Sequence, residues 1–290
     1  MILEHEIPNG SKLYFGYSAK IKRHIESVAS AILDEYGFEE IVTPIFSYHQ
    51  HKSIADEREL IRLNDEKNNA LSLRADSTID VVRIIEKRLG RNTQQKKWFY
   101  IQPVFTYPTT EQYQVGVEYI GEENLSGVLN LTTKIFEALE VEPLIQISNM
   151  KIPQLIVEMF DELCIDDFRH INIDKFLSLD IEWLTKLVYL QESSQLDEVI
   201  ACVPEALKNE LLKMKDLCDH LEGSNIKSVL APIYYAKMLY YDELFFRCIV
   251  NNEVLARGGR YENEGRKSVG FAIYTDVVCE ELTKKRGKDV

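Results

Sequence analysis

Alternating side chains over residues 113–120 place an amide and a carboxylate on one face of a predicted strand. The segment reads YQVGVEYI, and Gln114, Gly116 and Glu118 share a face because side chains two apart in a strand point the same way. A glycine within a strand often marks the close approach of a ligand. The two polar groups could therefore flank a gap that holds a small molecule. The alternative is an antiparallel strand with one face in solvent.

A second group of polar side chains lies at a predicted strand-to-helix junction. The stretch RADST covers residues 74–78. Asp76 and Thr78 could face a ligand together with the first group. They could equally well start the helix, because short polar residues satisfy the free N–H groups there. Ser77 followed by Asp80 predicts a capping box. The residues alone leave both interpretations open.

The elements that must position these groups alternate irregularly between helix and strand. Apolar residues at helical spacing end before Gly37, a residue typical of a helix C-terminus. Pro44 interrupts the next apolar run, which suits a strand that ends or lies at an edge. We predict two antiparallel strands joined by a turn at residues 108–111, then a helix at 125–139 and a strand at 143–148.

The chain changes character at residues 151–222, where strand signals vanish and helical segments follow one another. We interpret this block as a helical insertion. Beyond it, residues 230–250, 253–261 and 268–274 are predicted as consecutive antiparallel strands, followed by a closing helix. Strands and helices without regular alternation predict an α+β fold, with a mixed but mostly antiparallel sheet flanked by helices.

The composition argues against several classes of protein. The 290 residues are 45% hydrophobic and 28% charged, as in ordinary globular proteins. With 34 basic and 47 acidic residues, the formal net charge is −13. Nucleic acid is a poor candidate partner, because its binding surfaces need clustered positive charge. The five cysteines are scattered without a C-x-x-C pair, which indicates reduced thiols and argues against a zinc site.

Targeting and catalytic motifs are also missing from the sequence. The N-terminus lacks the pattern of a signal peptide, and no apolar run is long enough to span a bilayer. We therefore expect a cytoplasmic protein with no membrane partner. The glycine-rich stretch ARGGRYENEG matches neither phosphate-binding glycine motif, and no nucleophile motif occurs. No catalytic residue, metal or cofactor is predicted.

Five segments, taken in order, resemble the catalytic core of class II aminoacyl-tRNA synthetases, and most closely histidyl-tRNA synthetase. They are YGFEEIVTPIF for motif 1, LSLRADST for the L-R-P-E-x-T segment, FTYPTTEQYQVGVEYIG for motif 2 and its following strand, YYDELFF for the histidine-specific R-G-L-D-Y-Y-x-x-x-F stretch, and GGRYENEG with VGFAI for the approach to motif 3. The resemblance implies a class II synthetase-like α+β core formed by residues 1–150 and 223–290. Residues 151–222 are then the helical insertion.

The departures from this family imply that amino-acid activation is lost. In that reaction the amino acid's carboxylate attacks an ATP phosphorus, and guanidinium groups stabilise the charge that builds on the phosphate oxygens. The family's F-R-x-E positions are held here by Thr106 and Pro108, the histidine-specific arginine by Ala236, and the motif 3 arginine by Val277. Aminoacylation is predicted to be lost, and no anticodon-binding domain is expected.

The amino-acid half of the family's site is largely retained. The residues that the resemblance implies for histidine binding are Asp76, Thr78, Gln114, Glu118 and Tyr241. Asp76 and Thr78 would hold the ammonium group, Gln114 and Glu118 would orient the amino group and the imidazole, and Tyr241 would form an aromatic wall. Carboxylates facing an ammonium and an imidazole N–H are the charge-assisted contacts that histidine needs. The gap over Gly116 could therefore seat histidine, or it could be a relict of the family's histidine site.

One known family combines this fold with these losses, namely the regulatory subunit of short-form ATP phosphoribosyltransferase, the first enzyme of histidine biosynthesis. The resemblance implies a non-catalytic subunit that activates the short catalytic subunit, takes part in feedback inhibition by histidine and assembles as a hetero-octamer. Its own dimer would form through the motif 1 helix, about residues 18–36. Two other hypotheses are a class II-like amino-acid ligase acting on a small molecule or carrier protein, and a stand-alone histidine or amino-acid sensor. The missing arginines argue against the ligase.

Overall fold

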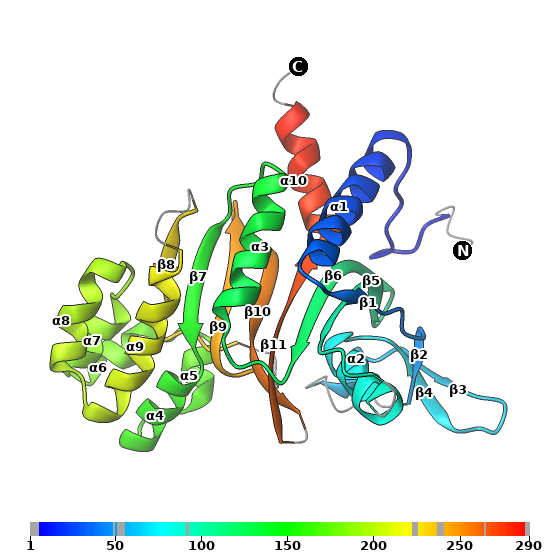
Figure 1. Ribbon diagram of the computed structural model, residues 1–290. Helices are drawn as coiled ribbons and strands as arrows, with labels where there is room; N and C mark the ends of the chain where they lie inside the picture. The colour runs from blue at the N-terminus through cyan, green and yellow to red at the C-terminus, as the bar shows by residue number, and fades with distance from the viewer. Residues whose placement is uncertain are drawn as a thin grey trace. The chain divides into compact units, whose positions relative to one another are not determined.

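The computed structural model describes residues 6–48, 50, 56–90, 93–221, 226–236, 241–263 and 265–287 (Figure 1). Its contacts divide the chain into two compact units. The first comprises Met1–Gly121, Lys134–Val141 and Gly270–Val290, and the second comprises Glu122–Thr133 and Glu142–Val269. The helical insertion predicted for residues 151–222 falls entirely within the second unit.

The first unit opens with a long amphipathic helix, α1 (Gly16–Glu35), which buries Ile21, Ile25 and Leu33 along one face. The helix ends as the sequence predicts. Gly37 adopts a φ of +77°, and its N–H donates to Asp34 O at 3.0 Å. A left-handed residue at this point satisfies carbonyls that the helix leaves free, and glycine adopts that conformation without steric cost.

The remaining elements of the first unit form the predicted hairpin and its surroundings. They are β1 (Glu39–Glu40), β2 (Phe46–Ser47), β3 (Arg62–Asn64), β4 (Ala70–Leu73), α2 (Thr78–Ile84), a π-helical turn (Ile85–Leu89), β5 (Lys97–Thr106), β6 (Thr110–Ile120) and α10 (Thr275–Gly287). The antiparallel pairing of β5 with β6 is confirmed, and a short turn joins them at residues 107–109. Helix α10 packs against α1 and β6.

The second unit contains the insertion helices and the strands on which they pack. These elements are β7 (Leu144–Asn149), α4 (Lys151–Met159), α5 (Ile165–Arg169), α6 (Ile173–Ser178), α7 (Glu182–Val188), α8 (Leu196–Cys202), α9 (Glu205–Asp219), β8 (Ser228–Leu230), β9 (Tyr241–Val250) and β10 (Glu253–Asn263). Helix α9 packs against β7 and α4 against β9. In Figure 1 the insertion helices, drawn in yellow-green, gather beside β7 and β8. Helix α3 (Ser126–Ala138) and strand β11 (Arg266–Tyr274) each contribute residues to both units.

The strands form an eight-stranded sheet in the order β1-β5-β6-β11-β10-β9-β7-β8 and a small sheet in the order β2-β4-β3. The pairs β1–β5 and β7–β8 are parallel, whereas β5–β6, β7–β9 and β9–β10 are antiparallel. The expected α+β class with a mostly antiparallel sheet is confirmed. One detail is wrong. The first strand after the insertion, β8, pairs in parallel with β7, and the described residues 231–236 form no strand.

The predicted capping box at the start of α2 is also wrong. Ser77 has helical φ and ψ and makes no capping bond, because its hydroxyl accepts a hydrogen bond from Gln102 at 3.1 Å. Asp76 caps the helix instead, since its carboxylate accepts the N–H of Ile79 at 3.1 Å. The Asp80 carboxylate turns away to accept bonds from Ser47 and from a glutamine, Gln50.

Among the described residues, no helix is long and apolar enough to cross a membrane. The same residues contain no cluster of three or more histidine, cysteine, aspartate or glutamate side chains arranged to hold a metal ion. All five cysteines are free thiols.

Candidate functional site

The register of β5 against β6 determines what faces the polar residues of β6. Gly116 lies opposite Tyr100, and Gln114 lies opposite Gln102. Directly opposite residues in an antiparallel pair point to the same side of the sheet. The predicted polar face of β6 therefore continues onto β5, where it gains a tyrosine and a second glutamine.

The expected gap over Gly116 is absent, because the ring of Tyr100 fills it. A Cβ added at Gly116 would lie 2.0 Å from Tyr100 Cζ and 2.2 Å from its hydroxyl oxygen. The glycine therefore permits a close approach, as the sequence indicated, but the approaching group is a side chain of the neighbouring strand. A ligand held by Gln114 and Glu118 would have to lie beside this ring and could not occupy the space over the glycine.

Glu118 is the most buried of the expected ligand-binding groups, with only 1% of its surface exposed. The Tyr100 hydroxyl donates to its Oε1 at a long 3.5 Å. On its other side the strand β11 approaches closely, since a Cβ on Gly270 would lie 2.5 Å from Glu118 Oε2. Gln114 is half-buried, and its amide donates to Gln112 at 3.2 Å. The carboxylate is thus fixed in place, while the amide is closer to solvent.

The start of α2 meets the same face through one hydrogen-bonded bridge. Gln102, opposite Gln114, donates to the Ser77 hydroxyl, which lies between Asp76 and Thr78 in the chain. Asp76 is buried and is held by Gln50, whose Oε1 accepts the Asp76 N–H at 2.7 Å. Thr78 is the first residue of the helix and is half-buried. The structure therefore joins the two polar groups that the sequence left separate.

Sequence reasoning missed three residues of this face, namely Tyr100, Gln102 and Gln50. The two on β5 carried a signal, because they share the alternating parity of a strand whose partner was already predicted. Gln50 carried none. Its amide accepts the N–H groups of Ala75 and Asp76 and donates to the Asp76 carbonyl, and only the tertiary fold brings residue 50 to residue 76.

Tyr241, the fifth expected residue, is the first residue of β9 in the second unit. Its ring is buried beside Phe245, with ring centroids 5.2 Å apart. It also lies against Gly259 of β10, where a Cβ would come within 2.6 Å of Tyr241 Cδ1. Gly259 of the GGRY stretch therefore makes room for an aromatic side chain.

The four positions at which the synthetase family has a charged residue are all uncharged here. Thr106 ends β5 and Pro108 lies in the exposed turn. Ala236 is buried, and its N–H donates to the sulfur of Met150 at 3.2 Å. Val277 lies in the first turn of α10. The arrangement offers buried carboxylates and amides that suit a zwitterionic ligand, without the guanidinium groups that phosphoryl chemistry needs.

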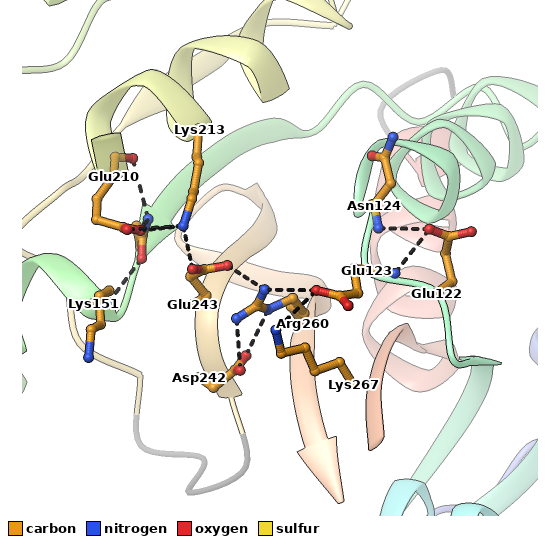
Figure 2. A network of polar contacts seen from close by, with 11 residues as sticks. Glu122, Glu123, Asn124, Lys151, Glu210, Lys213, Asp242, Glu243, Arg260 and Lys267 are labelled. Carbon is orange, nitrogen blue, oxygen red and sulfur yellow. Dashed lines mark hydrogen bonds and ion pairs between the residues drawn. The ribbon is translucent and has the colours of Figure 1, made fainter. Parts of the chain in front are cut away.

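A network of charged side chains connects several elements of the second unit (Figure 2). At its centre the Arg260 guanidinium contacts Glu243 at 2.7 Å, Asp242 at 2.9 Å and Glu123 at 3.5 Å. Lys213 of α9 reaches Glu243 at 2.5 Å. Lys267, Glu210 and Asn149 extend the network at its two ends. Because Arg260, Lys213 and Lys267 are each paired with carboxylates, we interpret the network as a structural link between α9 and strands β9 to β11.

Comparison with known proteins identifies the family. Residues 17–278 match the family model described as histidyl-tRNA synthetase. The chain is 46% identical to the ATP phosphoribosyltransferase regulatory subunit of Wolinella succinogenes over 98% of each chain. It is 44% identical to that of Helicobacter hepaticus over 97% of this chain and 99% of the relative. A solved structure from Bacillus halodurans, described as an ATP phosphoribosyltransferase regulatory subunit/histidyl-tRNA synthetase, matches with a TM-score of 0.85 at 21% identity, over 96% of this chain and 83% of that one. The chain therefore belongs to the ATP phosphoribosyltransferase regulatory subunit family, on the fold of histidyl-tRNA synthetase.

Proposed function

We propose that this chain is a non-catalytic subunit that activates the short-form catalytic subunit of ATP phosphoribosyltransferase and takes part in feedback inhibition by histidine. The observation that carries the proposal is the 46% identity to a regulatory subunit over 98% of both chains. The uncharged residues at the activation positions support it, because they supply no positive charge to a reacting phosphate group. The mechanism is linkage, in which partner and histidine favour different arrangements of one assembly and affect each other's binding equally.

The test is turnover of the purified catalytic subunit from the same organism, with and without this chain and then with histidine added. We expect the chain to raise turnover and histidine to lower the raised rate. If turnover is unchanged and the two proteins do not elute together, the regulatory role is wrong. A sensor with another partner then becomes the better hypothesis, and an amino-acid ligase does so only if calorimetry also detects ATP binding.

We propose that histidine binds through Asp76, Thr78, Gln114 and Glu118 of the first unit, beside the Tyr100 ring. The role of Tyr241, in the second unit, as an aromatic wall stays a prediction from the resemblance. The buried carboxylates of Asp76 and Glu118 supply the negative charge that an ammonium and an imidazole N–H require. We expect Gln114→Ala and Glu118→Ala each to weaken histidine binding by about tenfold or more, since each removes a hydrogen bond to a charged group. Calorimetric titration of histidine measures the effect.

Glu137→Gln is the matched control for Glu118, because Glu137 lies exposed on α3 and its loss removes the same charge. If Gln114→Ala and Glu118→Ala both bind histidine as the wild type does, the histidine site lies elsewhere in the assembly. That result would leave the activation of the catalytic subunit untouched.

We propose further that the subunit dimerises through α1 and the chain that follows it, within a hetero-octamer with the catalytic subunit. Large apolar side chains are exposed at both ends of α1, namely Phe15 before it and Val42 at 76% and Phe46 at 60% after it. Burial against a second copy of the chain would remove this apolar surface from water, which favours association. Beside them, α1 and β5 line a groove of about 620 Å³ that includes Lys22, Glu26 and Gln102.

The double variant Val42→Glu/Phe46→Glu is expected to shift the isolated subunit from dimer to monomer. Each apolar side chain contributes about 1.5–3 kcal/mol when buried, and a buried unpaired carboxylate opposes association further. The dimer dissociation constant should therefore rise at least roughly a hundredfold, as measured by sedimentation velocity. Tyr189→Glu, at an exposed site of the helical insertion, is the control. A dimer that survives the double variant would place the interface elsewhere.

A further inference from the structure

Residues 42–47 of the first unit reverse the usual distribution of polar and apolar side chains. Val42 and Phe46 are exposed, whereas the side chains of Thr43 and Ser47 are polar and buried. Apolar residues are normally the buried ones, so buried polar groups in such a segment need an explanation. The segment presents apolar side chains to the outside and is attached to the protein through hydrogen bonds.

The first of these attachments runs through Gln102 of β5, which is buried. Its Oε1 accepts the N–H and the hydroxyl of Thr43, each at 3.2 Å. Its Nε2 donates to the hydroxyls of Thr43 and Ser77, each at 3.1 Å. Ser77 lies between Asp76 and Thr78 in the chain, the two residues proposed to hold the ammonium group of histidine. One amide therefore contacts both the 42–47 segment and the start of the ligand-binding helix.

A second attachment runs through Asp80 of α2. Its carboxylate accepts hydrogen bonds from Ser47 Oγ at 3.0 Å and from Gln50 Nε2 at 2.6 Å. The oxygen of the same Gln50 amide accepts the N–H groups of Ala75 and Asp76, at 2.8 and 2.7 Å. A buried polar group that loses its partner costs free energy. A displacement of Ser47 is therefore resisted by the backbone on which Asp76 lies.

Backbone contacts attach the segment to the same part of the chain. The N–H of Arg74 donates to Ile45 O at 2.7 Å, and its guanidinium donates to Thr43 O at 2.9 Å. Strand β2 also pairs with β4, which leads into the junction. Residues 42–47 and 74–80 therefore form one hydrogen-bonded body within the first unit. That body carries both the exposed apolar side chains and the residues proposed to bind the ammonium group.

We propose that histidine binding and dimerisation are coupled through residues 42–47, so that each strengthens the other. The inference rests on the histidine site and the dimer proposed above. A ligand held by Asp76 and Thr78 restrains this hydrogen-bonded body. A surface that is already restrained loses less conformational freedom when a second copy of the chain covers Val42 and Phe46, which favours association. Because coupling of this kind is reciprocal, dimerisation raises the affinity for histidine by the same factor.

Two independent measurements on the full-length chain test the coupling. Sedimentation velocity gives the dimer dissociation constant of the wild type with and without saturating histidine. Calorimetry gives the histidine dissociation constant of the wild-type dimer and of the Val42→Glu/Phe46→Glu monomer. We expect both experiments to give a factor of at least about five. Their agreement excludes a local effect of the two glutamates, because the sedimentation experiment uses the unaltered chain.

The route of the coupling is tested by Thr43→Val/Ser47→Ala. This double variant removes both side-chain attachments and keeps the exposed apolar residues and the proposed ligand residues. The chain should still bind histidine and dimerise, but the coupling factor should fall to about one. Thr43→Val alone, a milder change, should lower the factor part of the way. Thr110→Val/Ser193→Ala makes the same two changes at exposed positions and should keep the wild-type factor.

The outcomes separate this inference from the functions on which it rests. Histidine that binds the wild type but leaves the dimer dissociation constant unchanged would overturn the coupling and leave the histidine site standing. Absence of histidine binding would overturn both. A wild-type coupling factor in Thr43→Val and in the double variant would show that residues 42–47 do not carry it. The regulatory role is decided separately, by turnover of the catalytic subunit.

Discussion

Replacing Arg74 with leucine is expected to destabilise the protein by about 3–5 kcal/mol, a large part of the total stability of a typical domain. Arg74 is 1% exposed. It donates to Pro103 O at 2.9 and 2.7 Å and to Thr43 O at 2.9 Å. These bonds tie the segment before β2 to strand β5. Leucine fills part of the space but leaves the buried carbonyls without donors, each costing about 1–3 kcal/mol.

Urea unfolding followed by circular dichroism measures this effect. The dependence of the free energy of unfolding on urea concentration, the m-value, should be the same in variant and wild type. The stability of Arg74→Lys should lie between those of the wild type and Arg74→Leu, because an ammonium keeps the charge but cannot span acceptors on two segments. Arg88→Leu, at an exposed position, should stay within about 0.5 kcal/mol of wild type. If the free energy of unfolding of Arg74→Leu lies within about 1 kcal/mol of the wild-type value, as it does for an ordinary substitution, the Arg74 contacts do not hold the two segments together.

Replacing Gly270 with alanine is expected to cost about 3 kcal/mol, at the upper end for an overpacked site. The added Cβ would lie 2.4 Å from the backbone oxygen of Val117 and 2.5 Å from Glu118 Oε2. A backbone carbonyl within a paired strand cannot rotate away, so β6 and β11 must separate locally. The same movement displaces the Glu118 carboxylate, and histidine binding should weaken together with stability.

Gly116→Ala is the informative comparison, because the three atoms nearest to its added Cβ all belong to the end of the Tyr100 side chain. Shortening that side chain should therefore relieve the strain. We expect Tyr100→Leu to recover part of the stability lost in Gly116→Ala and to recover none in Gly270→Ala. Double-mutant cycles from urea unfolding give the two coupling energies. Equal coupling in both pairs would contradict the assignment of Tyr100 as the group that fills the space over Gly116.

The local elements of this fold were predictable because they depend on short-range patterns. The period of apolar residues and the glycine after it located α1 and its end, and the alternation around the turn located β5 and β6. The same alternation correctly placed Gln114, Gly116 and Glu118 on one face. What it could not give was the occupant of that face, since Tyr100 reaches Gly116 only through the register between two strands.

The start of α2 shows where sequence patterns were insufficient. Ser77 and Asp80 have the spacing of a capping box, yet their side chains bond to Gln102, Ser47 and Gln50. Local capping bonds compete with hydrogen bonds to tertiary partners. Here the side chains bond to the buried partners, because leaving a buried polar group unsatisfied costs more free energy than leaving a helix end uncapped.

The sequence by itself determined the fold class, the family and the loss of the activating arginines, because these depend on residue types at matched positions. Only the tertiary structure decided the environment of each polar group. Arg74 begins the predicted strand-to-helix junction and Arg247 lies in a predicted strand, and neither position indicates in the sequence what the guanidinium contacts. One is satisfied by carbonyls from two distant segments, and the other faces a second arginine across a strand pair. Charge compensation depends on distances in space, which sequence spacing does not specify.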